Sequence, residues 1–583
     1  MARRRAGAPP VSVRGATTLR PVAATDVEVP VYDTATPRPS RRWWQRRWVP
    51  LAILAAVLAL PMRGLWRAPG PPMEEGFMLV FPEAVLHGAV PNRDFLHLYG
   101  PGSLWVLAAV FKVFGTSMWS ERAVGLLQQL ALIAGVYALA RPWGRRAAVA
   151  GAALTAIVIL PPTGLTALAW TGGVALAVWS LAALLHDRPA LAGVLGGVAL
   201  LYRPDLVVAV VLVFAVAWPV VGHATRRRLT IGAVAGLSPM LVHVALAGPG
   251  HAFFGMVVQP VFQLRAGRHL PLPPSWGHFD GFLQRAGALN APPWPVPWPP
   301  SPAQLTLWLG LLVAVVVLLL YAGWRIARDH QPATLQGRAV LLMAVLCAGL
   351  LPQALQRPDS THLAWVSAVP FGLVPVAVSE LLERWRPSSR TSHRLLAAAA
   401  LPALVLLVLV PHFTYRSYAD LVAQTFGKHR EVYVMHNEGR SFYYGRRDAA
   451  DAVNEMLPVV DRIARPGDRL FVGTGDLRKT PYSEAFLYYL LPQTRPGTRY
   501  IEMDPGVANR ADSHLADDLA SSDIVILSSI RDDWNEPNAS LDDGSDEPNE
   551  VLHAQFCLVG SFGRGLFGHG LYELYERCDR TGR

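Results

Sequence analysis

Two adjacent acidic residues, Glu74 and Glu75, follow the first long hydrophobic run of the chain. A charge beside a bilayer is costly unless it is solvated or paired, so acids at such a boundary are candidates for function. A carboxylate held there can act as a general base towards a hydroxyl group. Arg93, Asp94 and His97 complete a first polar cluster in the same stretch. The alternative interpretation is a solvated loop with ordinary surface charges.

Three further polar clusters lie beside hydrophobic runs and can meet the first one at the same membrane face. They are Tyr202-Arg203-Pro204-Asp205, then Gln259, Arg265, Arg268 and His269, and finally Gln356-Arg357-Pro358-Asp359-Ser360-Thr361-His362. Arginine pairs with phosphate oxygens through two parallel hydrogen bonds, which suits a lipid phosphate. The alternative is that each Arg-Pro-Asp run is a simple salt bridge that closes a loop.

The composition indicates a membrane protein with many spans. Of 583 residues, 52% are hydrophobic and only 16% are charged, which is too apolar for an ordinary soluble protein. Runs of about 20 apolar residues, the length that crosses a bilayer, recur along the chain. The net charge of +11 comes from basic residues at the ends of these runs, as in cytoplasmic loops. It does not indicate nucleic-acid binding.

The basic loops predict about eleven spans, with the N-terminus in the cytoplasm. The expected spans lie near residues 48–65, 122–140, 146–160, 165–185, 190–202, 206–221, 229–247, 304–324, 339–356, 363–383 and 394–411. Residues 103–114 are apolar but too few to cross comfortably. They predict an in-plane or re-entrant helix in the first outer loop, which protein or a wet cavity would cover.

The chain divides into three expected regions. Residues 1–47 are rich in Arg and Pro and are expected to be disordered in the cytoplasm. Residues 48–411 form the transmembrane domain, with large outer loops at 67–121 and 248–302. Residues 412–583 form a soluble α/β domain outside the cytoplasm. In that domain we expect strands at 469–473, 498–503 and 523–527 and helices at 482–491 and 515–519.

The first outer loop resembles that of a known family. The segments that carry the resemblance are Glu74-Glu75-Gly76-Phe77, Leu86-His87-Gly88-Ala89-Val90-Pro91-Asn92-Arg93-Asp94-Phe95, Tyr99-Gly100-Pro101, Phe114-Gly115 and Glu121-Arg122. They are similar to the first outer loop of GT-C glycosyltransferases, which include protein O-mannosyltransferases, lipid A aminoarabinose transferases and many actinobacterial relatives. The resemblance covers residues 48–412 and is strongest over residues 73–122.

The resemblance implies an integral membrane enzyme that takes a sugar from a polyprenyl monophosphate and inverts its anomeric centre. Family members carry the catalytic acid in this loop, usually as the Asp of an Asp-Glu pair, and that position is Glu74 here. Because Glu stands where Asp is usual, Glu75 and Asp94 remain alternatives for the base. The family commonly has Pro-Pro where this chain has Gly100-Pro101-Gly102.

We therefore expect a hexosyl- or pentosyltransferase at the outer face of the plasma membrane. No nucleotide sugar is supplied there, so the donor must arrive on a lipid, and a glycan, lipid or protein hydroxyl accepts the sugar. The residues expected to bind the donor phosphate or substrate are Arg93, His97, Arg203, Arg265, Arg357, Asp359 and His362.

The sequence contains no Cys and His spacing typical of a zinc site. We expect no required cofactor, and a divalent cation stays an open alternative. The alternative function is a non-catalytic membrane component of cell-envelope glycan assembly or export. A transporter would predict internal repeats and charges near mid-membrane. The sequence shows no repeat, and its spans are nearly free of charge.

The predicted topology is testable with a reporter that is active only outside the cytoplasm. Fused after Arg583, the reporter should be active, because the alternation of basic loops places the C-terminal domain outside. A stably produced but inactive fusion would contradict the topology and the outer-face site together.

Overall fold

The computed structural model describes residues 48–272, 301–329, 334–385, 417–428, 432–532, 537–565 and 570–580. The segment 1–47 and the expected span 394–411 lie outside these residues, as does much of the loop 248–302. Residues Pro50–Arg583 form one compact unit, and Met1–Val49 are assigned to another.

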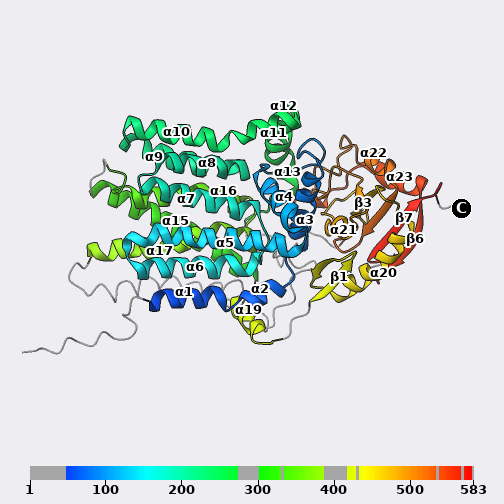
Figure 1. Cartoon of the computed structure of the whole chain (residues 1–583), viewed down its shortest axis with the longest axis horizontal. Coiled ribbons are helices and arrows are strands. Elements are labelled where there is room, and N and C mark those ends of the chain that lie inside the picture. The colour runs from blue at the N-terminus through cyan, green and yellow to red at the C-terminus, as the bar shows by residue number, and fades with distance from the viewer. Residues whose placement is uncertain are drawn as a thin grey trace, which may run out of the picture. The chain divides into compact units, whose positions relative to one another are not determined.

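The described residues between 49 and 385 form a bundle of mostly apolar helices (Figure 1). A helix satisfies its own backbone hydrogen bonds, which hydrocarbon requires of any segment that crosses it. The helices before the first gap in the described residues are α1 (Val49–Ala59), α2 (Met62–Arg67), α3 (Pro72–Leu86), α4 (Gly102–Phe114), α5 (Met118–Ala140), α6 (Arg145–Thr163), α7 (Ala169–Leu185), α8 (Pro189–Tyr202), α9 (Val207–Ala217), α10 (His223–Leu237), α11 (Pro239–Ala247), α12 (Pro249–Phe253), the π-helix η5 (Phe254–Gln263) and α13 (Leu264–Arg268). Those after it are α15 (Ser301–Asp329), α16 (Ala339–Gln356), α17 (Ser360–Trp385) and α19 (Ser417–Thr425).

Among the described residues, seven helices are long and apolar enough to cross a membrane. They are Val49–Arg67, Met118–Trp143, Arg145–Pro162, His223–Ala247, Gln304–Arg328, Ala339–Gln356 and Ser360–Leu381. Shorter apolar helices occupy the predicted spans 165–185, 190–202 and 206–221 and the predicted in-plane segment 103–114. The polytopic helical class is therefore confirmed, and three of the expected spans are short helices.

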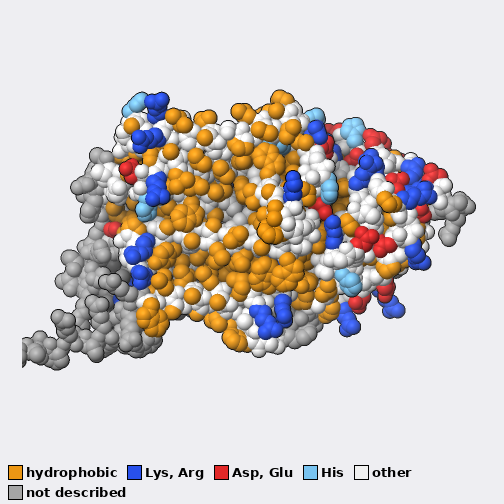
Figure 2. Space-filling view, in the orientation of Figure 1, with side chains coloured by type: hydrophobic (Ala, Val, Ile, Leu, Met, Phe, Trp, Pro, Cys, Tyr) orange, Lys and Arg blue, Asp and Glu red, His pale blue; other side chains and the backbone are white. Residues whose placement is uncertain are grey.

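The surface separates apolar from charged residues (Figure 2). Hydrophobic side chains cover the visible face of the bundle, and charged side chains of both signs gather over the C-terminal domain. Lys and Arg also gather at the end of the bundle away from that domain. The apolar surface of the bundle is therefore bounded at both ends by charged side chains.

Helices α8 and α10 pack closely through glycines. A Cβ atom at Gly193 would lie 2.1 Å from the carbonyl oxygen of Leu229, and one at Gly236 would lie 2.2 Å from that of Val194. Only glycine allows the two backbones to approach this closely, as in other helix pairs inside membranes.

The C-terminal domain is an α/β structure, as expected. Its helices are α20 (Arg447–Ile463), α21 (Phe486–Leu490), α22 (Leu515–Ala520) and α23 (Glu547–Gln555). Its strands are β1 (Tyr433–Asn437), β2 (Arg440–Tyr444), β3 (Arg469–Thr474), β4 (Arg495–Pro496), β5 (Ile524–Ser528), β6 (Phe556–Phe562) and β7 (Tyr572–Arg577). One sheet has the order β4-β3-β5-β7-β6, with β7 antiparallel to both neighbours, and β1 and β2 form a separate hairpin.

The prediction of a strand at residues 498–503 is wrong. Instead of joining the sheet, this segment bonds to the segment before α21, where the Tyr482 and Ser483 amides donate to the carbonyl oxygens of Met503 and Glu502. Met503 also has a φ of 54°, which interrupts an extended conformation. The expected strands 469–473 and 523–527 and the expected helix 515–519 are confirmed as β3, β5 and α22.

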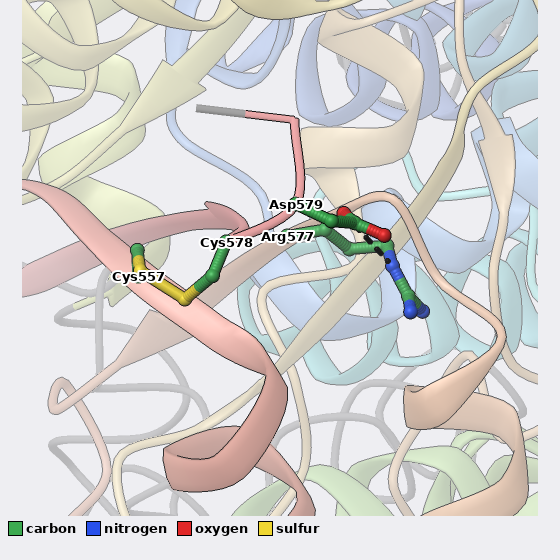
Figure 3. The surroundings of a disulfide bond; sticks show 4 residues. All are labelled: Cys557, Arg577, Cys578 and Asp579. Carbon is green, nitrogen blue, oxygen red and sulfur yellow. Dashed lines mark ion pairs between the residues drawn. A yellow bond between two sulfur atoms is a disulfide. The ribbon is translucent and has the colours of Figure 1, made fainter. Parts of the chain in front are cut away.

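A disulfide joins Cys557 on β6 to Cys578, just beyond β7 (Figure 3). Next to it, Arg577 pairs with Asp579 at 3.5 Å. The two cysteines are 21 residues apart in sequence, and their bond ties the end of the chain to the edge of the sheet. A disulfide of this kind persists only in an oxidising compartment.

Replacing both cysteines by serine should destabilise the C-terminal domain by about 3 kcal/mol, because the unfolded chain loses the constraint of a closed loop. Thermal melting of the parent and the double variant, each with and without reductant, checks this. Reductant should lower the melting temperature of the parent alone. An unchanged parent under reductant would contradict the stabilising role.

Candidate active site

A cavity lies where the start of α3 and the Tyr99 segment meet the turns after α8 and α16. Its free space, including the open mouth, is ≈ 530 Å³. The lining combines one carboxylate, three guanidinium groups and several rings: Met73, Glu74, Phe77, Met78, Tyr99, Leu168, Ala169, Trp170, Arg203, Arg268, Arg357, His362 and Trp365. Pockets with apolar walls and a few converging polar groups are typical ligand sites.

Helix α3 positions the two adjacent glutamates. It begins at Pro72, a residue suited to a first helical turn, and both acids lie in that turn, where the helix dipole favours them. Adjacent residues on a helix point about 100° apart, so the two side chains have different neighbours. Glu74 lines the cavity, while Glu75 forms an ion pair with Arg122 on α5.

The Glu75–Arg122 pair is buried and bidentate. The Arg122 Nε and Nη2 atoms donate to the two Glu75 carboxylate oxygens at 2.5 and 3.0 Å, and Nη1 donates to the Trp66 carbonyl oxygen at 2.7 Å. Breaking such a pair leaves an uncompensated buried charge. Glu75 therefore holds α3 against α5, and its carboxylate is already occupied by Arg122.

Glu74 is in a different state. Among the described residues, its Oε2 atom is buried and has no hydrogen-bond partner. Burial raises the pKa of Glu74 above its usual value, and the nearby Arg531 and Arg268 oppose that rise. A buried carboxylate with an unused oxygen and a raised pKa is a suitable proton acceptor.

Two of the three cavity arginines lie in matching turns. Arg203 ends α8 and Arg357 ends α16, with backbone angles of φ −141° and ψ 97° and of φ −139° and ψ 94°. A proline follows each arginine, which excludes helix and favours this extended conformation. In both turns the arginine donates to the aspartate two residues later: Arg203 to Asp205 at 2.8 and 2.7 Å, and Arg357 to Asp359 at 3.2 Å.

The two turns differ at their aspartates. The Asp205 side chain is 45% exposed, whereas Asp359 is buried and also accepts from the amide and ring nitrogens of His362 at 2.9 Å. Burial disfavours the charge on Asp359, but His362 and Arg357 outweigh it and hold its pKa below the usual range. The sequence pattern is the same in both turns, and only the second is a buried charge network.

The Tyr99-Gly100-Pro101 motif builds one wall of the cavity. The Gly100 amide donates to the carbonyl oxygen of Tyr202 at 3.1 Å, and a Cβ atom at Gly100 would lie 2.0 Å from the carbonyl oxygen of Leu201. This close approach brings the Tyr99 ring to 4.0 Å from the Arg203 guanidinium carbon. The aromatic face and the cation stabilise each other and orient Arg203.

Arg268, the third cavity arginine, comes from α13. Its backbone carbonyl accepts from Arg357 Nη1 at 2.9 Å, and its Nε donates to the Tyr482 hydroxyl at 2.9 Å. Its Nη1 lies 3.6 Å from Asp504. The cavity thus combines residues of the bundle with support from the C-terminal domain.

Six of the predicted site residues do not line the cavity: Glu75 and Asp359, whose ion pairs are described above, and Arg93, Asp94, His97 and Arg265. Arg93 and Asp94 pair with each other at 2.8 Å on the surface, and Arg265 is exposed. His97 is buried against the rings of Phe81, Phe95 and Tyr99. Burial lowers the pKa of His97 to about 3, so its ring is neutral and packs as an aromatic group.

The structure brings Glu74, Arg203, Arg357 and His362 together at the cavity, with Asp359 behind Arg357. Trp170 and Trp365 in the lining and Arg531 near Glu74 were not expected from the sequence. The tryptophans lie within hydrophobic runs, where the sequence pattern does not distinguish them from ordinary core residues. Across the described ranges, no group of three or more His, Cys, Asp or Glu residues is arranged to hold a metal ion.

Comparison with solved structures found similar folds at low sequence identity. ArnT from Cupriavidus metallidurans bound to undecaprenyl phosphate shares 14% identity, with 91% of this chain and 98% of that chain covered and a TM-score of 0.47. AglB from Archaeoglobus fulgidus, in complex with an inhibitory peptide and a dolichol-phosphate, also shares 14% identity, with 90% and 75% covered and a TM-score of 0.47.

Comparison with curated protein sequences found no match. Residues 99–245 match the family model described as dolichyl-phosphate-mannose-protein mannosyltransferase. The matched segment includes the Tyr99 wall and the Arg203 turn of the cavity. Over residues 99–245, the match supports the expected resemblance to protein mannosyltransferases.

Proposed function

We propose that the protein transfers a sugar from a polyprenyl-monophosphate donor to a hydroxyl acceptor at the outer face of the plasma membrane, with inversion. The observation that carries this proposal is the cavity itself. In it, the buried carboxylate of Glu74, whose Oε2 atom has no hydrogen-bond partner among the described residues, faces the same space as Arg203, Arg268 and Arg357. A base and a cluster of guanidinium groups are what an acceptor hydroxyl and a departing phosphate require.

The proposed reaction is a single displacement. The acceptor oxygen attacks the anomeric carbon as Glu74 takes its proton, and the bond between that carbon and the phosphate oxygen breaks. The electron pair of this bond stays on the polyprenyl phosphate. Arg203, Arg268 and Arg357 then stabilise the charge that develops on the phosphate, which is electrostatic catalysis by preorganised donors.

Glu75 and Asp94 are less suited to be the base. Glu75 is held by Arg122, and Asp94 accepts from Arg93 and from the Val90 amide on the surface. Arg122 and Arg93 keep these two carboxylates from a hydroxyl in the cavity. Glu74 has no such partner among the described residues.

Glu74→Gln should lower the transfer rate by roughly 10²–10⁴-fold, because the amide keeps the shape but cannot take a proton. Protein stability should be unchanged or improved, since a buried charge is removed. Glu75→Gln should instead destabilise by about 3–5 kcal/mol by leaving Arg122 unpaired. The measurements are transfer to a hydroxyl acceptor by purified protein and thermal melting.

A matched control for both variants is Glu83→Gln. Glu83 lies on the same helix, pairs with Arg440 at 2.7 Å and does not line the cavity. The Glu83→Gln variant should keep the parental transfer rate. Parental activity in Glu74→Gln together with loss in Asp94→Asn would move the base to Asp94.

Arg203→Ala should weaken binding of a polyprenyl monophosphate roughly 10- to 150-fold, the loss of one charge-assisted hydrogen-bonding partner. Arg203 is the cleanest of the three arginines to remove, because its partner Asp205 is exposed and can be solvated. The measurement is a binding titration, with Arg265→Ala as the control. Arg265 is exposed and lies outside the cavity lining. Equal affinities in the parent and Arg203→Ala would exclude the phosphate role of Arg203.

A further inference from the structure

Arg268 lies on a short helical segment whose position depends on contacts with other parts of the chain. Helix α13 has only five residues, and it follows the π-helix η5, which contains Pro260. π-helical turns are rare and are found mostly at functional sites. On the bundle side, the main chain near Arg268 is tied to the turn after α16, where Leu270 donates to the Gln356 carbonyl oxygen at 3.0 Å. The guanidinium group needs a separate support.

The C-terminal domain supplies that support directly. The Arg268 Nε donates to the Tyr482 hydroxyl at 2.9 Å, and the guanidinium carbon lies 5.3 Å from the centre of the Tyr482 ring. The Nη1 atom lies 3.6 Å from the carboxylate of Asp504, which is buried. One residue pair from the C-terminal domain therefore contacts the guanidinium group through a hydroxyl, a ring and a charge.

The helix that carries Arg268 is also packed into this domain. Leu264 is buried in a hydrophobic cluster with Phe471, Tyr500 and Met503. Gly267 lies so close to the C-terminal domain that a Cβ atom there would be 2.3 Å from the carbonyl oxygen of Pro505. Helix α13 thus packs on the C-terminal domain through Leu264 and Gly267.

The contacts to Arg268 come from a strained region. Tyr482 has a φ of 76° and Met503 a φ of 54°, values that bulky side chains rarely adopt. The Tyr482 amide donates to the Met503 carbonyl oxygen at 3.2 Å. This hydrogen bond joins the two residues that have positive φ angles. Backbone strain of this kind persists where the surroundings enforce it, and it is concentrated at ligand-binding positions.

We propose that Tyr482 and Asp504 are positioning residues that fix the Arg268 guanidinium in the donor-phosphate site, so that the C-terminal domain completes this site. The inference rests on the proposed function and deepens it. Tyr482 fixes the direction of the guanidinium plane through its hydroxyl, and Asp504 balances the positive charge while the phosphate is absent. Neither residue needs to touch the donor.

The test is a double-mutant cycle with undecaprenyl monophosphate as the binding probe. Tyr482→Phe removes one hydroxyl and should weaken binding about 2- to 10-fold, the value of one hydrogen bond. In an Arg268→Ala background the same change should have no further effect, because a positioning residue acts only through the residue that it positions. Asp504→Asn should behave in the same way.

The matched control is Tyr488→Phe. Tyr488 lies in the same domain, and its hydroxyl accepts from the Val472 amide at 2.9 Å, away from Arg268. It should keep the parental affinity, and thermal melting of every variant separates binding from stability. Gly267→Ala provides a steric test that changes no charge: it should weaken binding in the parent and not in the Arg268→Ala background.

The outcomes separate this inference from the proposed function. Parental affinity in Tyr482→Phe would overturn the positioning role. An equal loss of affinity in the parent and in the Arg268→Ala background would also overturn it. Neither result would contradict the proposed donor site. No binding of the probe by the parent protein would overturn the proposed function, and the positioning role with it.

Discussion

The site depends on one buried ion pair, between Glu75 on α3 and Arg122 on α5. It fixes the rotation of the first turn of α3, and the rotation decides where the neighbouring Glu74 points. The same helix is anchored at its other end, where Glu83 pairs with Arg440 of the C-terminal domain. A buried pair contributes little net stability but makes other arrangements costly. Orientation of Glu74 is therefore what this pair provides.

The arginines of the cavity show how a cationic site can exist beside a bilayer. Each guanidinium has a carboxylate partner: Asp205 for Arg203, Asp359 for Arg357 and Asp504 for Arg268. These partners offset the cost of burying charge. They also hold each guanidinium group in one orientation. Little side-chain entropy is therefore lost when an anion binds.

The helical membrane class and most helix positions could be predicted from the sequence. It also predicted that Glu74, Arg203, Arg357 and His362 belong to one site. Hydrophobic runs and Arg-Pro-Asp patterns are local signals, and they predicted these features. It did not separate Glu74 from Glu75, because the helix phase depends on Arg122, 47 residues away. It named Arg265 and not Arg268 as a donor-phosphate residue, because the exposure of these two side chains is set by packing against Pro505 and its neighbours, which is not a local signal. Residues 498–503 have strand-forming composition, and tertiary hydrogen bonds to Tyr482 and Ser483 override it.

The dependence of Arg268 on Tyr482 and Asp504 has a consequence for biogenesis. The bundle residues of the cavity all precede residue 366, whereas these two supports follow residue 480. A nascent chain can therefore insert its helices before the cavity is complete. The site becomes complete only after the last part of the chain has been synthesised and folded. Incompletely made or truncated chains would then carry an unfinished site, and the order of synthesis itself would keep them inactive.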